Sequence, residues 1–128
     1  MVHNRPRVMS FHLSLPVRDV EVAVNFFTGL LGGQVAHRDP TGYVNVDWFG
    51  TQLTLAQGEP PHLHDDLHFG VNVDMATFDA LATKIKARAA YYIVAPVKIV
   101  DANTPRERRK LVVRCPDGYL VELKGMHA

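Results

Sequence analysis

Apolar residues along the chain recur first at the spacing of a strand, then at the spacing of a helix, and then again at the spacing of a strand. This order occurs twice. Residues 9–17 alternate apolar and polar side chains, which predicts a half-buried strand. Asp19 is a good helix N-cap, and the apolar residues behind it recur at helical spacing. The Gly32-Gly33 pair supplies a stop signal. The chain is therefore expected to open with a strand and a helix.

Three β-like runs complete the first half of the chain. They lie at residues 34–38, 42–49 and 51–57, and the last two are joined at Phe49-Gly50 as a hairpin. Residues 58–65 contain two prolines and follow no period, which predicts a connector.

The second half has the same order of elements. Residues 66–73 are predicted as a strand, Asp74 as an N-cap, and the apolar residues behind it as a second helix. Three further β-like runs follow, at residues 91–100, 110–114 and 119–124. Pro96 lacks an amide donor, so the first of these runs is expected at a sheet edge.

Two copies of one module explain this order. Aligning His12 with His68 gives an offset of 56 residues, and aligning Gly50 with Gly118 gives an offset of 68 residues. The second module is therefore longer, and we expect its extra residues in a loop at 101–107.

The predicted fold class is α+β, with two βαβββ modules in a single domain of 128 residues. The first module spans about residues 8–57, the connector residues 58–65, and the second module about residues 66–125. A doubly wound nucleotide-binding fold is disfavoured, because no glycine-rich turn follows the first strand.

Composition narrows the expected partners and compartment. Lys and Arg number 14 and Asp and Glu 13, so a net charge of +1 gives no reason to expect nucleic acid or a membrane as a partner. No apolar run approaches the roughly 18 residues that span a membrane, and no secretory signal is visible. The single cysteine, Cys115, excludes an internal disulfide and favours a cytoplasmic location.

Three potential metal ligands stand at positions that the repeat relates. His12 and His68 lie on the polar side of the two opening strands, and Glu122 lies among apolar residues of the last strand. A carboxylate is expensive to bury unless it is paired or bound to a metal. Two imidazoles and one carboxylate are the ligand set of a facial triad. Each residue alone is more often an ordinary strand residue, but the three together favour a metal site.

The chain resembles the vicinal oxygen chelate superfamily, also called glyoxalase/bleomycin resistance/extradiol dioxygenase, over roughly residues 10–125. Four segments carry the resemblance: residues 11–19 as the opening strand with a metal histidine, 25–32 as a helix end, 68–71 as the second histidine strand, and 116–123 as the closing signature. Within the superfamily the chain looks most like small single-domain proteins described as predicted extradiol-dioxygenase relatives.

The resemblance implies a U-shaped, half-open eight-stranded sheet around one divalent metal, with His12, His68 and Glu122 as its ligands. It also implies that Thr54 is the counterpart of Glu122, where typical glyoxalase I enzymes have a fourth ligand. Threonine is a poor metal ligand, so a three-ligand site is expected. Fe²⁺ is the favoured metal, with Mn²⁺, Zn²⁺ and Ni²⁺ as alternatives.

The predicted function is a metal-dependent, ring-cleaving dioxygenase that acts on a small catecholic substrate. The alternatives are a metal-dependent lyase, isomerase or epimerase, and a non-catalytic small-molecule binding protein of the bleomycin-resistance type. A homodimer is expected, because the open sheet leaves edges that a second copy could protect and because relatives are commonly dimeric.

The remaining site predictions rest on which strand residues share a face with the proposed ligands and on where a residue lies along the chain. His62 and His64, in the connector, are the candidate proton acceptors. The candidate pocket residues are Ser14, Gln52, Thr54, Asn72 and Tyr119. A basic cluster at residues 106–110 could meet a carboxylate substrate, but such charge runs are more often solvated.

Overall fold

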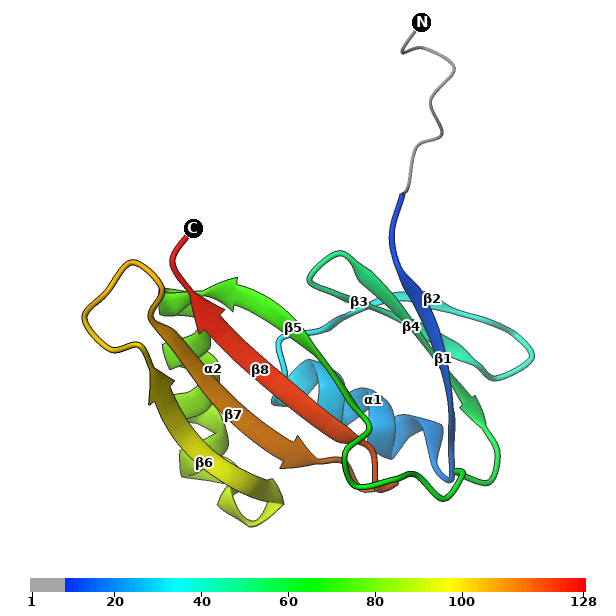
Figure 1. The fold of residues 1–128 in the computed structure, drawn as a ribbon. Helices are drawn as coiled ribbons and strands as arrows, with labels where there is room; N and C mark the ends of the chain where they lie inside the picture. Colours follow the sequence, from blue (N-terminus) through cyan, green and yellow to red (C-terminus); the bar gives the residue numbers. More distant parts are fainter. Residues whose placement is uncertain (1–8) are drawn as a thin grey trace, which may run out of the picture.

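Two βαβββ modules follow each other along the chain in a computed structural model that describes residues 9–128 (Figure 1). The elements are β1 (His12–Val17), α1 (Val20–Gly29), β2 (Gln34–Arg38), β3 (Val44–Trp48), β4 (Thr51–Gln57), β5 (His68–Asp74), α2 (Met75–Arg88), the 3-10 helix η2 (Ala90–Tyr92), β6 (Ile93–Val100), β7 (Arg108–Arg114) and β8 (Leu120–Met126). The predicted α+β class and module order are confirmed. The strand expected from residue 91 begins at Ile93, because η2 occupies the first positions.

Each module forms one four-stranded sheet. The strand orders are β1-β4-β3-β2 and β5-β8-β7-β6, and in each sheet the first pair is parallel and the others are antiparallel. The eight strands of one chain therefore lie in two separate sheets, with β1 and β5 at their edges. β6 is also an edge strand, as its proline predicted.

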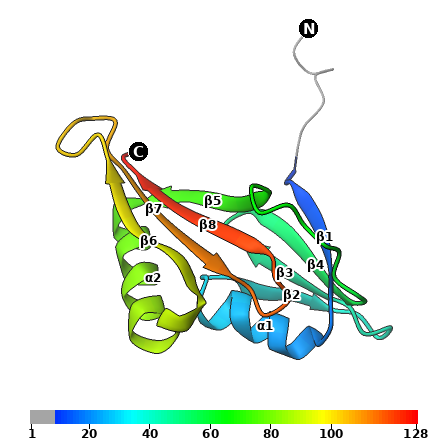
Figure 2. The same ribbon diagram turned by 60° about the horizontal axis from the view of Figure 1, so that its bottom comes forward.

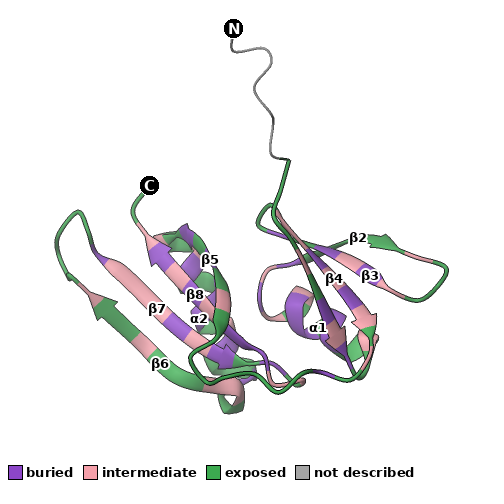
Figure 3. Ribbon diagram, turned by 45° about the vertical axis from the view of Figure 1, so that its right-hand side comes forward, coloured by how far each residue is buried: buried purple, intermediate pink, exposed green. Residues whose placement is uncertain are grey.

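The two helices lie on one side of the sheets (Figure 2). In β1, β3, β4, β5 and β7, buried residues alternate with exposed or half-buried ones, which is the alternation expected of sheets covered on one face, whereas the edge strands β2 and β6 have no buried residue (Figure 3). We call the face of each sheet that is turned away from the helices its open face.

The strand register reproduces the sequence repeat. His12 opens β1 and His68 opens β5. In the parallel pairs, Thr54 lies opposite the second residue after His12, and Glu122 lies opposite the second residue after His68. Thr54 and Glu122 are therefore structural counterparts, as the resemblance implied.

The extra length of the second module is distributed over several elements. α2 has 14 residues where α1 has 10, β6 has 8 where β2 has 5, and β7 has 7 where β3 has 5. Residues 101–107 do form a loop, but the expectation that this loop holds the insertion is wrong. Longer elements extend the regular pairing without exposing additional unpaired backbone.

Both predicted N-caps are confirmed. The carboxylate of Asp19 accepts a hydrogen bond from the Val22 amide at 3.1 Å, and that of Asp74 accepts one from the Thr77 amide at 2.7 Å. Within the part of the chain that the structure describes, no helix is long and apolar enough to cross a membrane.

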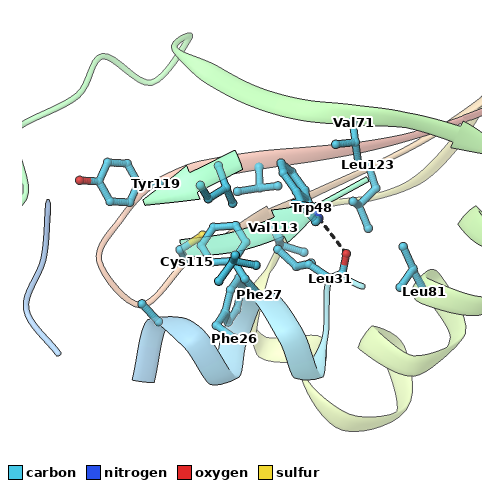
Figure 4. Close-up of a cluster of buried hydrophobic side chains, with 14 of the residues drawn as sticks. Phe26, Phe27, Leu31, Trp48, Val71, Leu81, Val113, Cys115, Tyr119 and Leu123 are labelled. Atoms are coloured by element: carbon cyan, nitrogen blue, oxygen red, sulfur yellow. Dashed lines mark hydrogen bonds between the residues drawn. The ribbon is translucent and has the colours of Figure 1, made fainter. Parts of the chain in front are cut away.

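An aromatic core joins the two modules (Figure 4). Trp48 is 1% exposed, and its indole Nε1 donates to the Leu31 carbonyl oxygen at 2.8 Å. Its ring meets Phe27 of α1 edge-on at 5.7 Å and Phe69 of the second module at 5.9 Å. Cys115 lies in the same core, and burial raises the pKa of its thiol, so it is unreactive at neutral pH.

The Asp74 cap gives α2 a pH-dependent stability. Hydrogen bonds from the Thr77 amide and hydroxyl hold the pKa of the Asp74 carboxyl below its ordinary value of 3.8. A lowered carboxyl pKa stabilises the folded state above the unfolded pKa, and this stabilisation is lost as the pH falls through the folded pKa. We expect Asp74→Ala to lower Tm at pH 7, and the difference from the wild type to shrink below pH 3.8. Thermal melts followed by circular dichroism test this.

The matched control is Asp65→Ala, which removes an exposed connector carboxylate and should leave Tm unchanged. An equal loss of Tm for Asp74→Ala at every pH would contradict the assignment of the effect to the ionised carboxylate.

Candidate functional site

His68 and Glu122 lie together on the open face of the second sheet. β5 and β8 are neighbours, and Glu122 is opposite Gly70, two residues beyond His68. A side chain at Gly70 would collide with the Glu122 carbonyl oxygen, so glycine allows the close approach of the strands. His68, Glu122, Asn72 and Lys124 line a hollow of about 220 Å³, which we call the polar hollow.

The two donors are held in defined states. The Glu122 side chain is 16% exposed and its carboxylate pairs with Lys124 Nζ at 3.5 Å, so its charge is partly balanced within the chain. His68 Nδ1 lies 3.2 Å from the Asp66 carbonyl oxygen. A carbonyl oxygen only accepts hydrogen bonds, so this contact favours the neutral tautomer with the proton on Nδ1, in which Nε2 is the nitrogen that can bind a metal.

His12 lies on the other sheet. It is exposed at the start of the edge strand β1, opposite Gln52, and does not line the polar hollow. Among residues 9–128, no three His, Cys, Asp or Glu side chains come close enough to hold a metal ion. A single chain thus brings two of the predicted donors to one hollow and leaves the third on the first sheet.

An apolar hollow of about 310 Å³ lies between β1 and β5. Its lining is Phe11, Leu13, Ser14, Leu15, Pro16, Pro61, Leu63, Leu67, His68, Phe69, Tyr119 and Leu120. His68 lines both this apolar hollow and the polar hollow. Phe69 lines both hollows as well, so the two spaces adjoin at these residues, a combination suited to a ligand with an apolar body and a polar end.

The predicted pocket residues separate into three groups. Asn72 lines the polar hollow, and Ser14 and Tyr119 line the apolar hollow. Gln52 and Thr54 lie on β4 of the first sheet, away from both. The Thr54 hydroxyl donates to the Asn45 side-chain oxygen at 2.7 Å, across the β3–β4 pair.

The connector histidines lie outside both hollows. His62 lines a separate hollow beside Arg18 and Asp117. His64 Nδ1 accepts a hydrogen bond from the Asp66 amide at 3.1 Å. Both flank Leu63, which does line the apolar hollow.

Two features of the surface were not found from the sequence. Lys124 shares the polar hollow with Glu122. It comes two residues after Glu122 in the last predicted strand, so the sequence could have placed both side chains on the same face of the sheet. A hollow of about 750 Å³ lies at the start of α1 beside residues 41–43 and contains none of the predicted metal donors.

Tyr119 links the modules in addition to lining the apolar hollow. Its buried hydroxyl donates to the Pro16 carbonyl oxygen at 2.6 Å. Burial raises the pKa of this phenol, with a further contribution from the Asp117 carboxylate, so the hydroxyl remains a donor at neutral and mildly alkaline pH.

We expect Tyr119→Phe to lower the free energy of unfolding by about 1–2 kcal/mol, because it leaves the Pro16 carbonyl without this donor. Urea unfolding measures the effect, and Tyr91→Phe, at a phenol that is 79% exposed, should have a much smaller effect. An equal free energy of unfolding for the wild type and Tyr119→Phe would show that the hydrogen bond between Tyr119 and Pro16 contributes nothing to stability.

Comparison with known proteins places the fold in a family. A family model described as Glyoxalase/Bleomycin resistance protein/Dioxygenase superfamily matches residues 10–123. A glyoxalase/bleomycin resistance protein/dioxygenase from Alicyclobacillus acidocaldarius has a similar structure, with a TM-score of 0.73 and 25% identity over 93% of this chain and 92% of that one.

Two further solved structures share the fold at lower identity. TioX from Micromonospora sp. ML1 gives a TM-score of 0.68 and 20% identity over 91% of this chain and 97% of that one. The fosfomycin resistance protein FosX from Listeria monocytogenes gives 0.70 and 14%, over 94% of this chain and 93% of that one. A search of curated protein sequences gives no significant match.

Proposed function

Because the chain belongs to the glyoxalase/bleomycin resistance protein/dioxygenase superfamily, we propose that it is a metal-dependent enzyme acting on a small substrate with two adjacent oxygen atoms. The specific reaction that we propose is ring cleavage of a catecholic substrate. One observation carries the proposal: the strand register relates His12 to His68 by the repeat and sets Glu122 beside His68 at one hollow.

The chemistry of the donor set fits a divalent metal. Two imidazoles and a carboxylate are the ligands of a facial triad, which favours Fe²⁺ and also accepts Mn²⁺, Zn²⁺ or Ni²⁺. The hydrogen bond at His68 Nδ1 supports this role, since histidine ligands commonly donate their other ring nitrogen to a carbonyl group. His12, His68 and Glu122 are thus the proposed ligands.

A second copy of the chain is the proposed source of the third ligand. Within one chain His12 is apart from the other two donors. The edge strands β1 and β5 have no further strand partner among the described residues, and exposed Phe11 and Leu67 lie directly before them. Pairing of two copies along these edges would cover apolar surface and could bring His12 of one copy to His68 and Glu122 of the other.

The surrounding residues suit a small aromatic substrate. A bound divalent metal would stabilise the negative charge of two adjacent oxygens. The apolar hollow beside His68 would hold the ring and exclude water. His62 and His64 are the proposed proton acceptors, because both flank Leu63 of that hollow.

Metal content and oxygen uptake together test the proposed function. The protein is purified without chelator or histidine tag, its metal is measured, and it is then reconstituted anaerobically with Fe²⁺ and exposed to oxygen with a panel of catechols. We expect about one metal per chain, oxygen uptake and a yellow ring-fission product. Glu122→Ala should abolish all three. Glu59→Ala, at an exposed connector carboxylate, should abolish none.

Other results would indicate other activities that occur in the superfamily. Tight binding of Zn²⁺ or Mn²⁺, without oxygen uptake but with turnover of a 2-oxo or thiohemiacetal substrate, would replace ring cleavage by lyase, isomerase or epimerase chemistry. Binding of aromatic compounds by a protein that takes up no metal would indicate a non-catalytic binding protein.

A further inference from the structure

Three lysines form a row across the open face of the second sheet. Lys98 of β6 lies opposite Lys110 of β7, and Lys110 lies opposite Lys124 of β8. Asn72 of β5 lies opposite Lys124 and extends the row. We call Lys98, Lys110 and Lys124 the lysine row.

Contacts of the neighbouring residues fix the side to which the row points. Arg109, next to Lys110, reaches the Asp79 carboxylate of α2 at 2.7 Å. Gly125, next to Lys124, is so close to α2 that a Cβ there would collide with a helix side chain. Successive strand residues point to opposite faces, so Lys110 and Lys124 point away from α2 and onto the open face.

The row is electrostatically unfavourable for the chain by itself. Like charges directly opposite one another on neighbouring strands destabilise a sheet. Lys124 has a partner in Glu122 at 3.5 Å, whereas Lys98 and Lys110 form no ion pair with any residue between 9 and 128. Lys110 is also half-buried, so water screens its charge less than it would at a fully exposed position. Fold stability does not account for this arrangement, but an anion bound on the row would.

The row continues from the polar hollow. Lys124 and Asn72 line that hollow together with His68 and Glu122. Positions on one face of a strand repeat about every 7 Å, so Lys124 is one such step beyond Glu122. The lysine ammonium groups and the side-chain amide of Asn72 can donate hydrogen bonds, and an oxyanion accepts such bonds.

We infer that the lysine row and Asn72 bind an anionic group of the substrate, a carboxylate or a phosphoryl group, next to the proposed metal ligands. This inference rests on the proposed function, because it assigns the substrate of that site to small organic anions. The apolar hollow, which His68 also lines, would then hold the remaining carbon skeleton.

Anion titrations of the wild type and lysine variants test the inference. Methylphosphonate and pyruvate, a phosphoryl-type and a carboxylate probe, are titrated calorimetrically at low salt into the metal-free and the metal-loaded protein. At least one probe should bind saturably, and Lys110→Gln and Lys124→Gln should each weaken it about tenfold. Lys86→Gln makes the same change of charge on the exposed side of α2 and should leave binding unchanged. The probe that binds more tightly identifies the anionic group.

Thermal melts provide a second measurement that needs no activity. Lys110→Gln relieves repulsion, so its Tm without anion should equal or exceed that of the wild type. The preferred anion should raise Tm of the wild type and of Lys86→Gln, and should raise that of Lys110→Gln clearly less at the same anion concentration.

Metal analysis of the same samples separates the two proposals. Weaker anion binding in Lys110→Gln while its metal content is retained supports the lysine row. If neither the wild type nor any variant binds metal but Lys110→Gln still binds the anion more weakly than the wild type, the metal proposal fails and the row stands. If neither probe binds, or if Lys86→Gln weakens binding as much as Lys110→Gln, the inference is overturned whatever the metal content.

Discussion

A mixture of the His12→Ala and Glu122→Ala variants is expected to bind the metal that neither variant binds alone. In the proposed dimer, each site takes His12 from one copy and His68 and Glu122 from the other. A mixed dimer therefore has one site with all three ligands and one site that lacks two of them. Random pairing makes half of the dimers mixed, so the mixture should hold about one quarter of the wild-type metal content. Co-refolding, gel filtration and metal analysis of the dimer peak measure this.

A second mixture is the matched control. His68 and Glu122 lie at one hollow of the same chain, so His68→Ala and Glu122→Ala remove ligands from the same half of a site. No dimer of these two variants has a complete ligand set, and their mixture should bind no metal. Failure of the first mixture to regain metal would contradict a site shared between copies. Metal retained by His12→Ala alone would remove His12 from the ligand set.

Replacement of Trp48 by alanine is expected to lower the free energy of unfolding by about 3–5 kcal/mol. The side chain is 1% exposed, so its loss leaves a cavity between α1 and the first sheet. The substitution also removes the edge contact with Phe69, which belongs to the second module, and leaves the Leu31 carbonyl without its indole donor. This is a large fraction of the roughly 5–15 kcal/mol that stabilises a typical domain. Urea unfolding followed by circular dichroism measures the change.

Two further variants make this measurement decisive. Trp48→Phe keeps most of the packing but loses the hydrogen bond to Leu31, and should cost about 1–3 kcal/mol. Tyr91→Ala removes an aromatic ring that is 79% exposed and should have little effect. A loss for Trp48→Ala no larger than that for Tyr91→Ala would contradict the view that Trp48 joins the modules in a shared core.

The sequence determined the features that depend on local pattern and on the internal repeat. Apolar periodicity located both helices, and the carboxylates of Asp19 and Asp74 defined their first turns. The repeat paired Thr54 with Glu122, and the register confirms this, since two similar modules that pair their first and last strands in the same way place equivalent residues alike. These features can be read along the chain, because the period of a strand or helix already specifies which residues share a face.

Tertiary structure alone decided which of these residues meet. His68 and Glu122 share a hollow because β5 and β8 pair in one sheet, whereas His12 is in the other sheet, and no local signal encodes how two modules pack. The hydroxyl of Tyr119 binds the carbonyl of Pro16, a contact between residues 103 positions apart.

The lysine row was hidden from the sequence for a related reason. The β6–β7 register shifts at two places, between Ile93 and Ala95 and between Ala95 and Lys98, so counting residues along β6 does not predict what lies opposite Lys110. The sequence shows which residues of one strand point to the same face. Which residue lies opposite on the neighbouring strand depends on bulges and turns, and these are set only in the folded chain.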